Sequence, residues 1–430
     1  MVPLIFILLA FAGCSMQIGD SLLAPPNLPS EYVQLEKQLK AIREEGAEYI
    51  VAESGTDRQS VQMVDLDADG YNEAVAFFRM ADGVLRAYLF EYDQGGYYQL
   101  GYIEGLNARR LHSVQFLEFD GSGVQAIALS WTYDETENRG LTVTCYDDGR
   151  LTTMLQTQYK GILHADGNND GKLDIFTVTV NDVTGAHRAR VFELKGEVFE
   201  QTREVAMCSE VLNVLSIKLG RGTDGDNLLC IDSAAHGSGY VTDVIRWEKE
   251  TDNLTMDSII GSGSSTYRQA AVFCTDIDGD GRIEVPIVEK SGSGRIGWFC
   301  YGSSGREHSG ETYYSVADGW YMFWPQNWQD EVFSQRTVND GTSMTTFYVP
   351  VTAGAHSELR NALLTVYVFS GEQSSDTLQS YSGVRVLQTV GSTIYAYNIM
   401  QNDFPEYAIA DWDMAGLFKI IEASSTAEGY

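Results

Sequence analysis

The sequence is short of basic residues, proline and patterned cysteine. It carries 29 Lys and Arg against 60 Asp and Glu, for a formal net charge of −31. Recognition of nucleic-acid phosphates requires a basic face, so nucleic acid is excluded as a partner. An excess of carboxylates of this size also repels itself in the folded chain, and bound divalent cations would relieve part of that cost.

The cysteines and histidines form no metal-ligand or disulfide pattern. After Cys14, five cysteines remain; they are scattered and lack paired spacing, so we expect small core residues rather than a zinc site or a disulfide framework. A Cys274–Cys300 pair stays open. The six histidines lack ligand spacing, and no Gly-x-Ser-x-Gly motif occurs, so no nucleophile elbow is indicated.

Glycine and aromatic residues are plentiful where proline is scarce. The chain holds 42 Gly and 8 Pro, and Phe, Trp and Tyr make up 11% of it. This composition is typical of an all-β protein with many tight turns. At 430 residues the chain exceeds the usual single core, so we expect two or more folding units.

One nine-residue phrase occurs three times between short apolar runs. Oxygen-bearing side chains stand at positions 1, 3, 5 and 9, and glycine stands at position 6. Ca²⁺ takes about six to eight oxygen ligands, and alternate residues of a tight loop can point at one ion while the position-7 carbonyl adds another oxygen. The phrase therefore predicts about three calcium ions; the alternative is acidic turns without an ion. The predicted ligands are Asp65, Asp67, Asp69, Tyr71 and Glu73; Asp166, Asn168, Asp170, Lys172 and Asp174; and Asp276, Asp278, Asp280, Arg282 and Glu284.

These loops are not EF-hands. An EF-hand needs a bidentate Glu at position 12, where this chain has Ala76, Thr177 and Ile287. The runs that follow the loops are short and rich in β-branched or aromatic residues, as in Ala74–Phe78 and Ile175–Val180, so they predict strands rather than helices. We expect strands upstream as well, at Val61–Val64 and Ala270–Cys274.

The loops mark an internal repeat of about 50–55 residues. Weaker copies stand at the intermediate positions: Glu118–Gly123 keeps acidic residues at positions 1 and 3 but has Ala126 at position 9, and Gly220–Gly225 keeps only an Asp-Gly turn. A weak fourth ion near Glu118 and Asp120 stays open, and we expect none in the Gly220 copy. Four short strands per unit favour a five-bladed β-propeller, alternatively with up to seven blades; a β-sandwich array or solenoid is the other option.

The loop-plus-strands unit resembles the calcium-binding repeats of the FG-GAP/VCBS type, found in integrin-like propellers. The Phe-Gly and Gly-Ala-Pro motifs that name the FG-GAP repeat are absent, so the resemblance is specific for the calcium loop and spans about 250 residues. It implies a propeller fold, an extracellular setting, and adhesion or ligand display. The whole layout also resembles lipoproteins of Gram-positive anaerobes.

The N-terminal segment predicts export. Residues 3–13 are apolar, uncharged and too short to span a bilayer. The segment ends Phe-Ala-Gly before Cys14, which resembles a lipobox, although Phe11 replaces the usual Leu and no Lys or Arg precedes the run. We therefore expect a lipoprotein signal peptide over 1–13, lipidation at Cys14 and a tether over 14–30. The periodicity predicts a helix over 31–46.

The repeat region extends over 47–311, and a separate α+β domain is expected over 312–430. Its opening, Tyr321 to Trp328, resembles domains of the PsbP-like kind, and residues 407–421 predict a closing helix. Trp320, Trp324 and Trp328 could stack on sugars, but their apolar surroundings favour a core role.

Together these features predict a calcium-stabilised, non-enzymatic lipoprotein at the outer face of the cell membrane, serving binding, adhesion or scaffolding. Its ligand would be extracellular: a glycan, cell-wall material or a protein. The alternative is a carbohydrate-active enzyme, a polysaccharide lyase or hydrolase, that uses the propeller loops as a sugar cleft.

Overall fold

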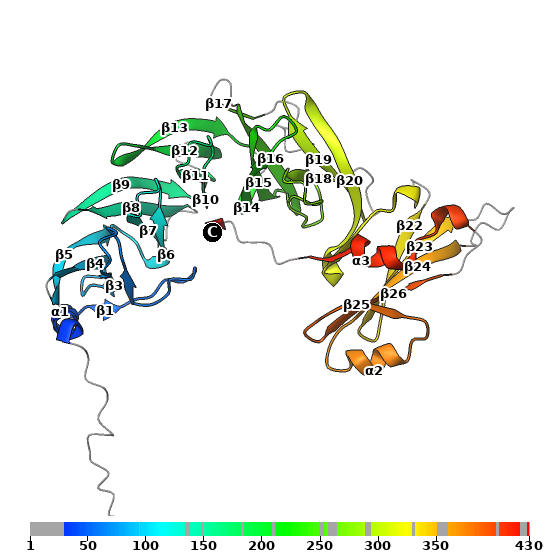
Figure 1. The fold of residues 1–430 in the computed structure, drawn as a ribbon, viewed down its shortest axis with the longest axis horizontal. Helices are drawn as coiled ribbons and strands as arrows, with labels where there is room; N and C mark the ends of the chain where they lie inside the picture. The colour runs from blue at the N-terminus through cyan, green and yellow to red at the C-terminus, as the bar shows by residue number, and fades with distance from the viewer. Residues whose placement is uncertain are drawn as a thin grey trace, which may run out of the picture. The chain divides into compact units, whose positions relative to one another are not determined.

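The chain folds as two compact units, which consist of Met1–Val51 with Gln59–Leu106 and of Ala52–Arg58 with Asn107–Tyr430. Both are mainly β (Figure 1). The expected signal peptide, Cys14 and the tether up to residue 29 lie outside the described residues. The computed structural model describes residues 30–93, 95–133, 138–147, 149–181, 185–208, 211–248, 253–256, 265–288, 294–328, 332–350, 360–400, 404–421 and 428–429.

The first unit is one sheet with a helix packed on it. The predicted helix is confirmed: α1 runs from Ser30 to Glu44, and Gly46 follows with a φ of 91°. Leu35 and Leu39 are buried and join the same apolar core as the sheet residues, because they share one face of the helix. The sheet holds β1 (Glu48–Tyr49), β2 (Val61–Val64), β3 (Glu73–Arg79), β4 (Leu85–Asp93) and β5 (Gly96–Gly105), with β3 between β4 and both β1 and β2.

The second unit continues with four antiparallel sheets of the same kind, in chain order (Figure 1). The second sheet holds β6 (Arg110–Glu118), β7 (Gln125–Thr132), β8 (Arg139–Asp147) and β9 (Arg150–Tyr159). The third holds β10 (Gly161–Ala165), β11 (Asp174–Thr179), β12 (Arg188–Lys195) and β13 (Val198–Ala206), with β28 (Glu428–Gly429) parallel to β10. The fourth holds β14 (Val211–Arg221), β15 (Asn227–Ala235), β16 (Gly239–Glu248) and β17 (Asn253–Met256). The fifth begins with β18 (Glu284–Ile287), β19 (Arg295–Gly302) and β20 (Gly305–Ser315).

Successive sheets of the second unit share apolar cores. Along β11, Ile175 joins the core with the second sheet, and the next residue, Phe176, joins the core with the fourth. Side chains of a strand alternate between its two faces, so each face contacts a different neighbour. The fourth and fifth sheets meet in the same way through Val244 and Val285. The third and fourth sheets are thus buried on both faces.

The fifth sheet extends past the expected domain boundary. The boundary between 311 and 312 falls inside β20, and the sheet continues through β21 (Trp320–Phe323) to β27 (Phe418–Ile420). The closing helix expected over 407–421 is wrong. Short helical turns, η4 (Pro405–Tyr407), η5 (Asp411–Asp413) and α3 (Met414–Leu417), lead instead into β27, which pairs with β21.

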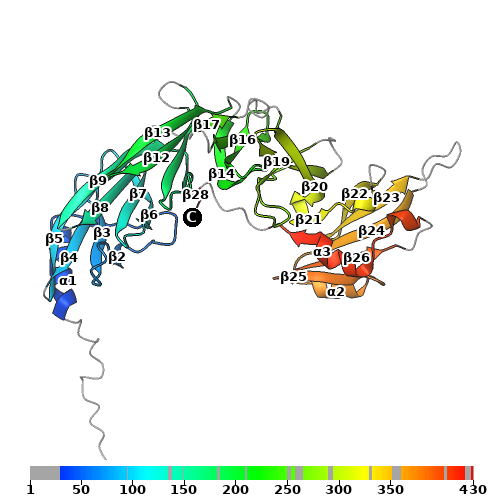
Figure 2. The same cartoon turned by 45° about the horizontal axis from the view of Figure 1, so that its top comes forward.

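The sixth sheet forms the C-terminal region with these turns. Its strands are β22 (Phe333–Asn339), β23 (Thr342–Pro350), β24 (Arg360–Phe369), β26 (Thr393–Ile399) and β25 (Arg385–Val390), in that order. Helix α2 (Ser374–Gln379) contacts β24 and β26 (Figure 2). The core includes Trp320, Trp324 and Trp328, from β21 to η3 (Gln326–Trp328), all at most 9% exposed, so the predicted core role of these residues is confirmed.

The mainly β class and the four-strand repeat are therefore confirmed. The strands expected around the first two loops form as β2, β3, β10 and β11. The strand expected at Ala270–Cys274 is wrong, because pairing is confined to the flanking residues Arg268 and Thr275, in single bridges with Tyr240 and Glu284. Closure of the sheets into a propeller stays a prediction.

Candidate metal loops

The three acidic loops share one backbone fold. Each loop ends at the first residue of a strand: β3, β11 or β18. In each loop the position-1 carboxylate accepts the N–H of the position-6 glycine. The N···O distances are 3.1 Å for Gly70–Asp65, 2.9 Å for Gly171–Asp166 and 2.9 Å for Gly281–Asp276.

Positions 3 and 5 are held by the same kind of bond. The side-chain oxygen of position 3 accepts the position-5 N–H, at 3.2 Å in the first loop, 2.9 Å in the second and 3.1 Å in the third. The position-5 carboxylate accepts the N–H of Tyr71, Lys172 or Arg282 at position 7. These bonds turn the side chains of positions 1, 3 and 5 inward along one tight turn.

Left-handed backbone at two positions makes this turn. The glycines at position 6 have φ between 85° and 90°. Position 4 is left-handed too, at Ala68 (64°), Asn169 (61°) and Gly279 (81°). Glycine and asparagine adopt this conformation most readily, which explains why the loop requires Gly at position 6.

Position 9 supplies a buried carboxylate at the base of each loop. Glu73, Asp174 and Glu284 are at most 2% exposed. Each accepts the N–H of position 2, at 2.9 to 3.0 Å. Burial, together with the charges of nearby carboxylates, raises the pKa of each of these three carboxyls to about 7. An oxygen-rich, negatively charged site that is poorly solvated fits a hard cation.

Side-chain oxygens converge in the first and third loops. Ligand atoms of Asp65, Asp67 and Glu73 lie within 4.8 Å of one another, and so do those of Asp276, Asp278 and Glu284. In the first loop, Asp65 Oδ1 is buried without a hydrogen-bond partner. A buried carboxylate oxygen without a hydrogen-bond partner is expected where that oxygen coordinates a metal ion.

The second loop and the position-5 residues depart from this pattern. Asn168 Nδ2 donates to Asp170 at 3.2 Å and to the buried Glu193 at 3.0 Å. In the third loop, Asp280 forms a salt bridge with Arg282 instead of joining the cluster. Sequence reasoning did not identify Glu193, because it lies on β12 and no local pattern links it to the loop.

The weaker copies keep part of the turn. Gly123 N–H donates to Glu118 at 2.8 Å and Ser122 N–H to Asp120 at 3.1 Å, as in the full loops, but Ala126 provides no carboxylate at position 9. In the Gly220 copy, Asp224 at position 5 accepts the N–H of Asp226 at position 7, at 3.4 Å, and also the N–H of Ser303 at 2.5 Å. The second sheet therefore has the turn without its base, and the fourth sheet keeps only the bond between positions 5 and 7, since positions 1 and 3 are glycines.

A serine and a histidine lie together outside the loops. Ser54 Oγ is 3.1 Å from His112 Nε2, and Glu53 is 3.9 Å from His112 Nδ1. A catalytic triad needs a hydrogen bond from the acid to the imidazole. Glu53 instead bonds Arg110 at 2.9 Å, and Ser54 N–H donates to the His112 carbonyl at 2.8 Å. We assign this cluster to local structure.

No protein-family model and no curated protein matches the chain. Among solved structures, a protein from Lactobacillus plantarum is 11% identical, with 72% of this chain and 85% of that chain covered and a TM-score of 0.26. A rhamnogalacturonan lyase from Bacillus licheniformis is 12% identical (82% and 72% covered, TM-score 0.28). A mannose phosphorylase from Leishmania mexicana is 12% identical (64% and 91% covered, TM-score 0.23). At TM-scores this low the likeness supports no conclusion about fold or activity.

Proposed function

We infer that this chain is an exported, calcium-stabilised lipoprotein whose repeated sheets display a non-enzymatic binding, adhesion or scaffold surface. The observation that carries the calcium assignment is the threefold recurrence of one loop geometry. In each copy a buried position-9 carboxylate accepts the N–H of position 2 at the base of the turn, and in the first and third copies its oxygens converge with those of positions 1 and 3. The residues that would hold the ions are the predicted ligands at positions 1, 3, 5 and 9, with the position-7 carbonyls.

The ion would be structural. It ties the segment before each loop to the strand after it and neutralises carboxylates that otherwise repel one another. Extracellular modules bind Ca²⁺ with dissociation constants of about 10⁻⁴–10⁻³ M. At about 1 mM ion and a dissociation constant of about 0.1 mM, each site stabilises the fold by about 1.4 kcal/mol.

A five-bladed propeller is the architecture we favour for the repeat. Five consecutive sheets each contain a four-stranded antiparallel run in chain order, and neighbours within the second unit share apolar cores. Blades of a propeller have this layout.

Export and lipidation at Cys14 rest on the sequence. None of the helices in the described part of the chain is long and apolar enough to cross a bilayer. Anchoring through a lipid at Cys14, followed by the tether, would place the sheets at the outer face of the membrane. There they would meet a glycan, cell-wall material or a protein.

Metal analysis tests the calcium assignment. Equilibrium dialysis against about 1 mM Ca²⁺ should show about three calcium ions bound per chain above the free concentration, as the three loops predict. Asp278→Ala should remove one, and the exposed Glu372→Ala, remote from every loop in sequence, should remove none. Absence of calcium from the unmodified chain would refute the assignment, and a screen of glycans and cell-wall fractions with and without Ca²⁺ would identify the ligand class.

One pocket favours the enzymatic alternative. A pocket beside the third loop is lined by Asp278, His308 and Glu311 together with Phe323 and Trp324. Its volume of about 650 Å³ is typical of small-ligand sites. Two carboxylates, an imidazole and aromatic rings would suit a sugar. Release of oligosaccharides from a polysaccharide panel, abolished by Glu311→Gln, would establish a lyase or hydrolase. A panel without cleavage favours the binding role.

A further inference from the structure

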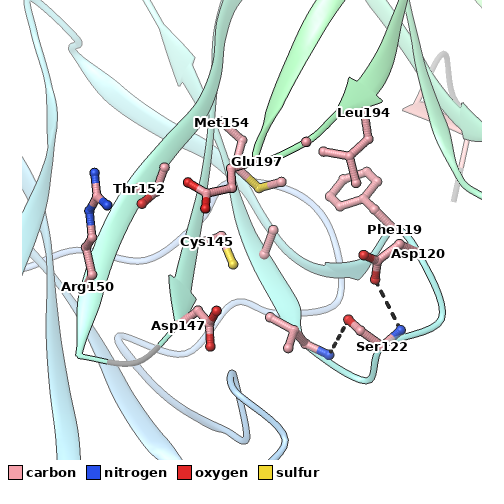
Figure 3. A pocket seen from close by; sticks show the side chains of 13 residues that line it. Phe119, Asp120, Ser122, Cys145, Asp147, Arg150, Thr152, Met154, Leu194 and Glu197 are labelled. Atoms are coloured by element: carbon pink, nitrogen blue, oxygen red, sulfur yellow. Dashed lines mark hydrogen bonds between the residues drawn. The ribbon is translucent and has the colours of Figure 1, made fainter.

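A second pocket lies between the second and third sheets and involves none of the three full metal loops. Its volume is about 480 Å³. Three turns surround it: the β6–β7 loop with Asp120 and Ser122, the β8–β9 hairpin with Asp147, and the β12–β13 hairpin with Glu197 (Figure 3). This is the size range of small-ligand sites.

The pocket exists where the second sheet has lost its position-9 carboxylate. Ala126 stands where the full loops have Glu or Asp, and it pairs with Cys145 on β8, which pairs with Thr152 on β9. All three line the pocket. Small side chains in this row leave space that a buried carboxylate and its ion would fill in the other copies.

The interior of the pocket combines an apolar wall with carboxylates. Phe119, Met154 and Leu194 supply the wall. Phe119 is buried and held edge-to-face against Phe199, whereas Met154 and Leu194 remain partly exposed. Methionine is flexible and polarizable, so the wall can adapt to an alkyl chain.

The carboxylates make the interior electronegative. Asp147 and Glu197 are exposed, lie on opposite sides of Cys145 (Figure 3) and have no hydrogen-bond or ion-pair partner among the described residues. Burial, together with the charges of Asp147, Asp120 and Glu197, raises the pKa of the Cys145 thiol to about 11. The charged groups that act on this thiol are thus all negative.

One cation, Arg150, lines the pocket, and a second, Lys172, acts on one of its carboxylates. Arg150 lies at the side away from Phe119 and Asp120 (Figure 3). Lys172, on the loop of the third sheet, helps to lower the pKa of Asp120, after the hydrogen bond from Ser122. Asp147 and Glu197, which form no ion pair among the described residues, remain to receive a cation from outside.

We propose that this pocket binds a primary alkyl ammonium group, with the alkyl chain along Phe119, Met154 and Leu194 and the ammonium between Asp147 and Glu197. A lysine-type side chain of a peptide and a free alkyl amine share this chemistry. No residue of a full metal loop lines the site, although Leu173 of the second loop donates to the Phe119 carbonyl at 2.8 Å, so we expect binding without calcium as well. The pocket would thus give the calcium-stabilised display surface a specific class of ligand.

The test is titration of the full chain with n-pentylammonium, followed by calorimetry or saturation-transfer NMR, in EDTA and again in millimolar Ca²⁺. We expect saturable binding in both conditions, weakened by salt, and weaker or no binding of n-pentanol and hexanoate. Asp147→Asn and Glu197→Gln should each raise the dissociation constant about two- to fivefold, as expected for exposed ion pairs, and about tenfold together. Arg150→Gln should lower the dissociation constant, because it removes a positive charge that repels the ammonium.

Glu200→Gln is the matched control, because Glu200 is exposed on β13 three residues after Glu197 but does not line the pocket. It should bind like the unmodified chain. Equal binding of pentanol and pentylammonium, or unchanged affinity in the Asp147→Asn/Glu197→Gln chain with an unchanged melting temperature, would overturn the proposal. Tighter binding of Nα-acetyl-lysine methylamide than of pentylammonium would assign the ligand to peptides, and the reverse to free amines. Binding in EDTA separates this result from the calcium assignment.

Discussion

Glu284→Gln tests whether the third loop is built around a cation. Glu284 is 0% exposed, and its pKa is raised from 4.5 to about 7, first by burial and then by the charges of Asp278, Asp280 and Asp276. Since the pKa is higher in the folded than in the unfolded chain, the stability that the protonated group contributes is complete below pH 4.5. It is lost as the pH rises through about 7. At about 1.4 kcal/mol per pKa unit, ionised Glu284 costs about 3 kcal/mol at pH 8 without metal.

The glutamine variant removes this cost and also one calcium ligand. Its amide oxygen can still accept the Ile277 N–H that now bonds Glu284 at 3.0 Å. In EDTA at pH 8 the variant should therefore be more stable than the unmodified chain by up to about 3 kcal/mol, and at pH 5 by less than about 1 kcal/mol. Adding about 1 mM Ca²⁺ should narrow the gap at pH 8 by about 1.4 kcal/mol, because only the unmodified chain gains an ion at this loop.

Urea denaturation at the two pH values, with EDTA or Ca²⁺, measures these differences. Glu307→Gln serves as the control; its side chain is 63% exposed, so its removal should change stability by less than about 0.5 kcal/mol. A Gln variant that is less stable than the parent in EDTA at pH 8 would show that Glu284 is held by interactions other than a metal. Equal stabilisation of both chains by calcium would place the ion elsewhere.

Three further substitutions test the packing around the loops. Arg268→Met should destabilise the chain by about 3–5 kcal/mol in urea, because it leaves the fully buried Asp232, 2.8 Å from the guanidinium, without its cation. Burial raises the pKa of the Asp243 carboxyl to about 6, so the stability that its protonated form contributes is lost as the pH rises. Asp243→Asn should therefore stabilise the chain by up to about 3 kcal/mol at pH 8 and have little effect below pH 4. Gly167→Ala should lower the melting temperature by about 2–4 °C per kcal/mol of lost stability, as a Cβ would come within 2.4 Å of the Trp247 ring.

The loops were predictable because their chemistry is local. Five residues within nine positions set the turn, and the position-9 carboxylate begins the next strand, so spacing alone identified Glu73, Asp174 and Glu284. The ion pair between Asp232 and Arg268 was not predictable, because its members stand 36 residues apart and neither occurs in a motif. Position 9 of the second copy did carry a signal, Ala126, but the sequence does not show that the vacated volume becomes a pocket.

The C-terminal errors have a common cause. Apolar residues in 407–421 gave a helical pattern, but Phe418 and Ile420 lie beside β21 in the structure and form the last strand of the fifth sheet. Pairing with an available sheet edge overrides a weak local preference for helix. The same pairing explains why the strand that opened the expected domain belongs to the fifth sheet.

Because β27 completes the fifth sheet, the C-terminal region cannot be dissected cleanly from the repeats. A recombinant fragment that stops at residue 311 would sever β20, and one that stops at residue 324 would keep β21 but leave it as a bare edge. Exposed strand edges recruit other chains, so both truncations should aggregate. Studies of ligand binding by parts of this protein are better served by point variants than by deletions.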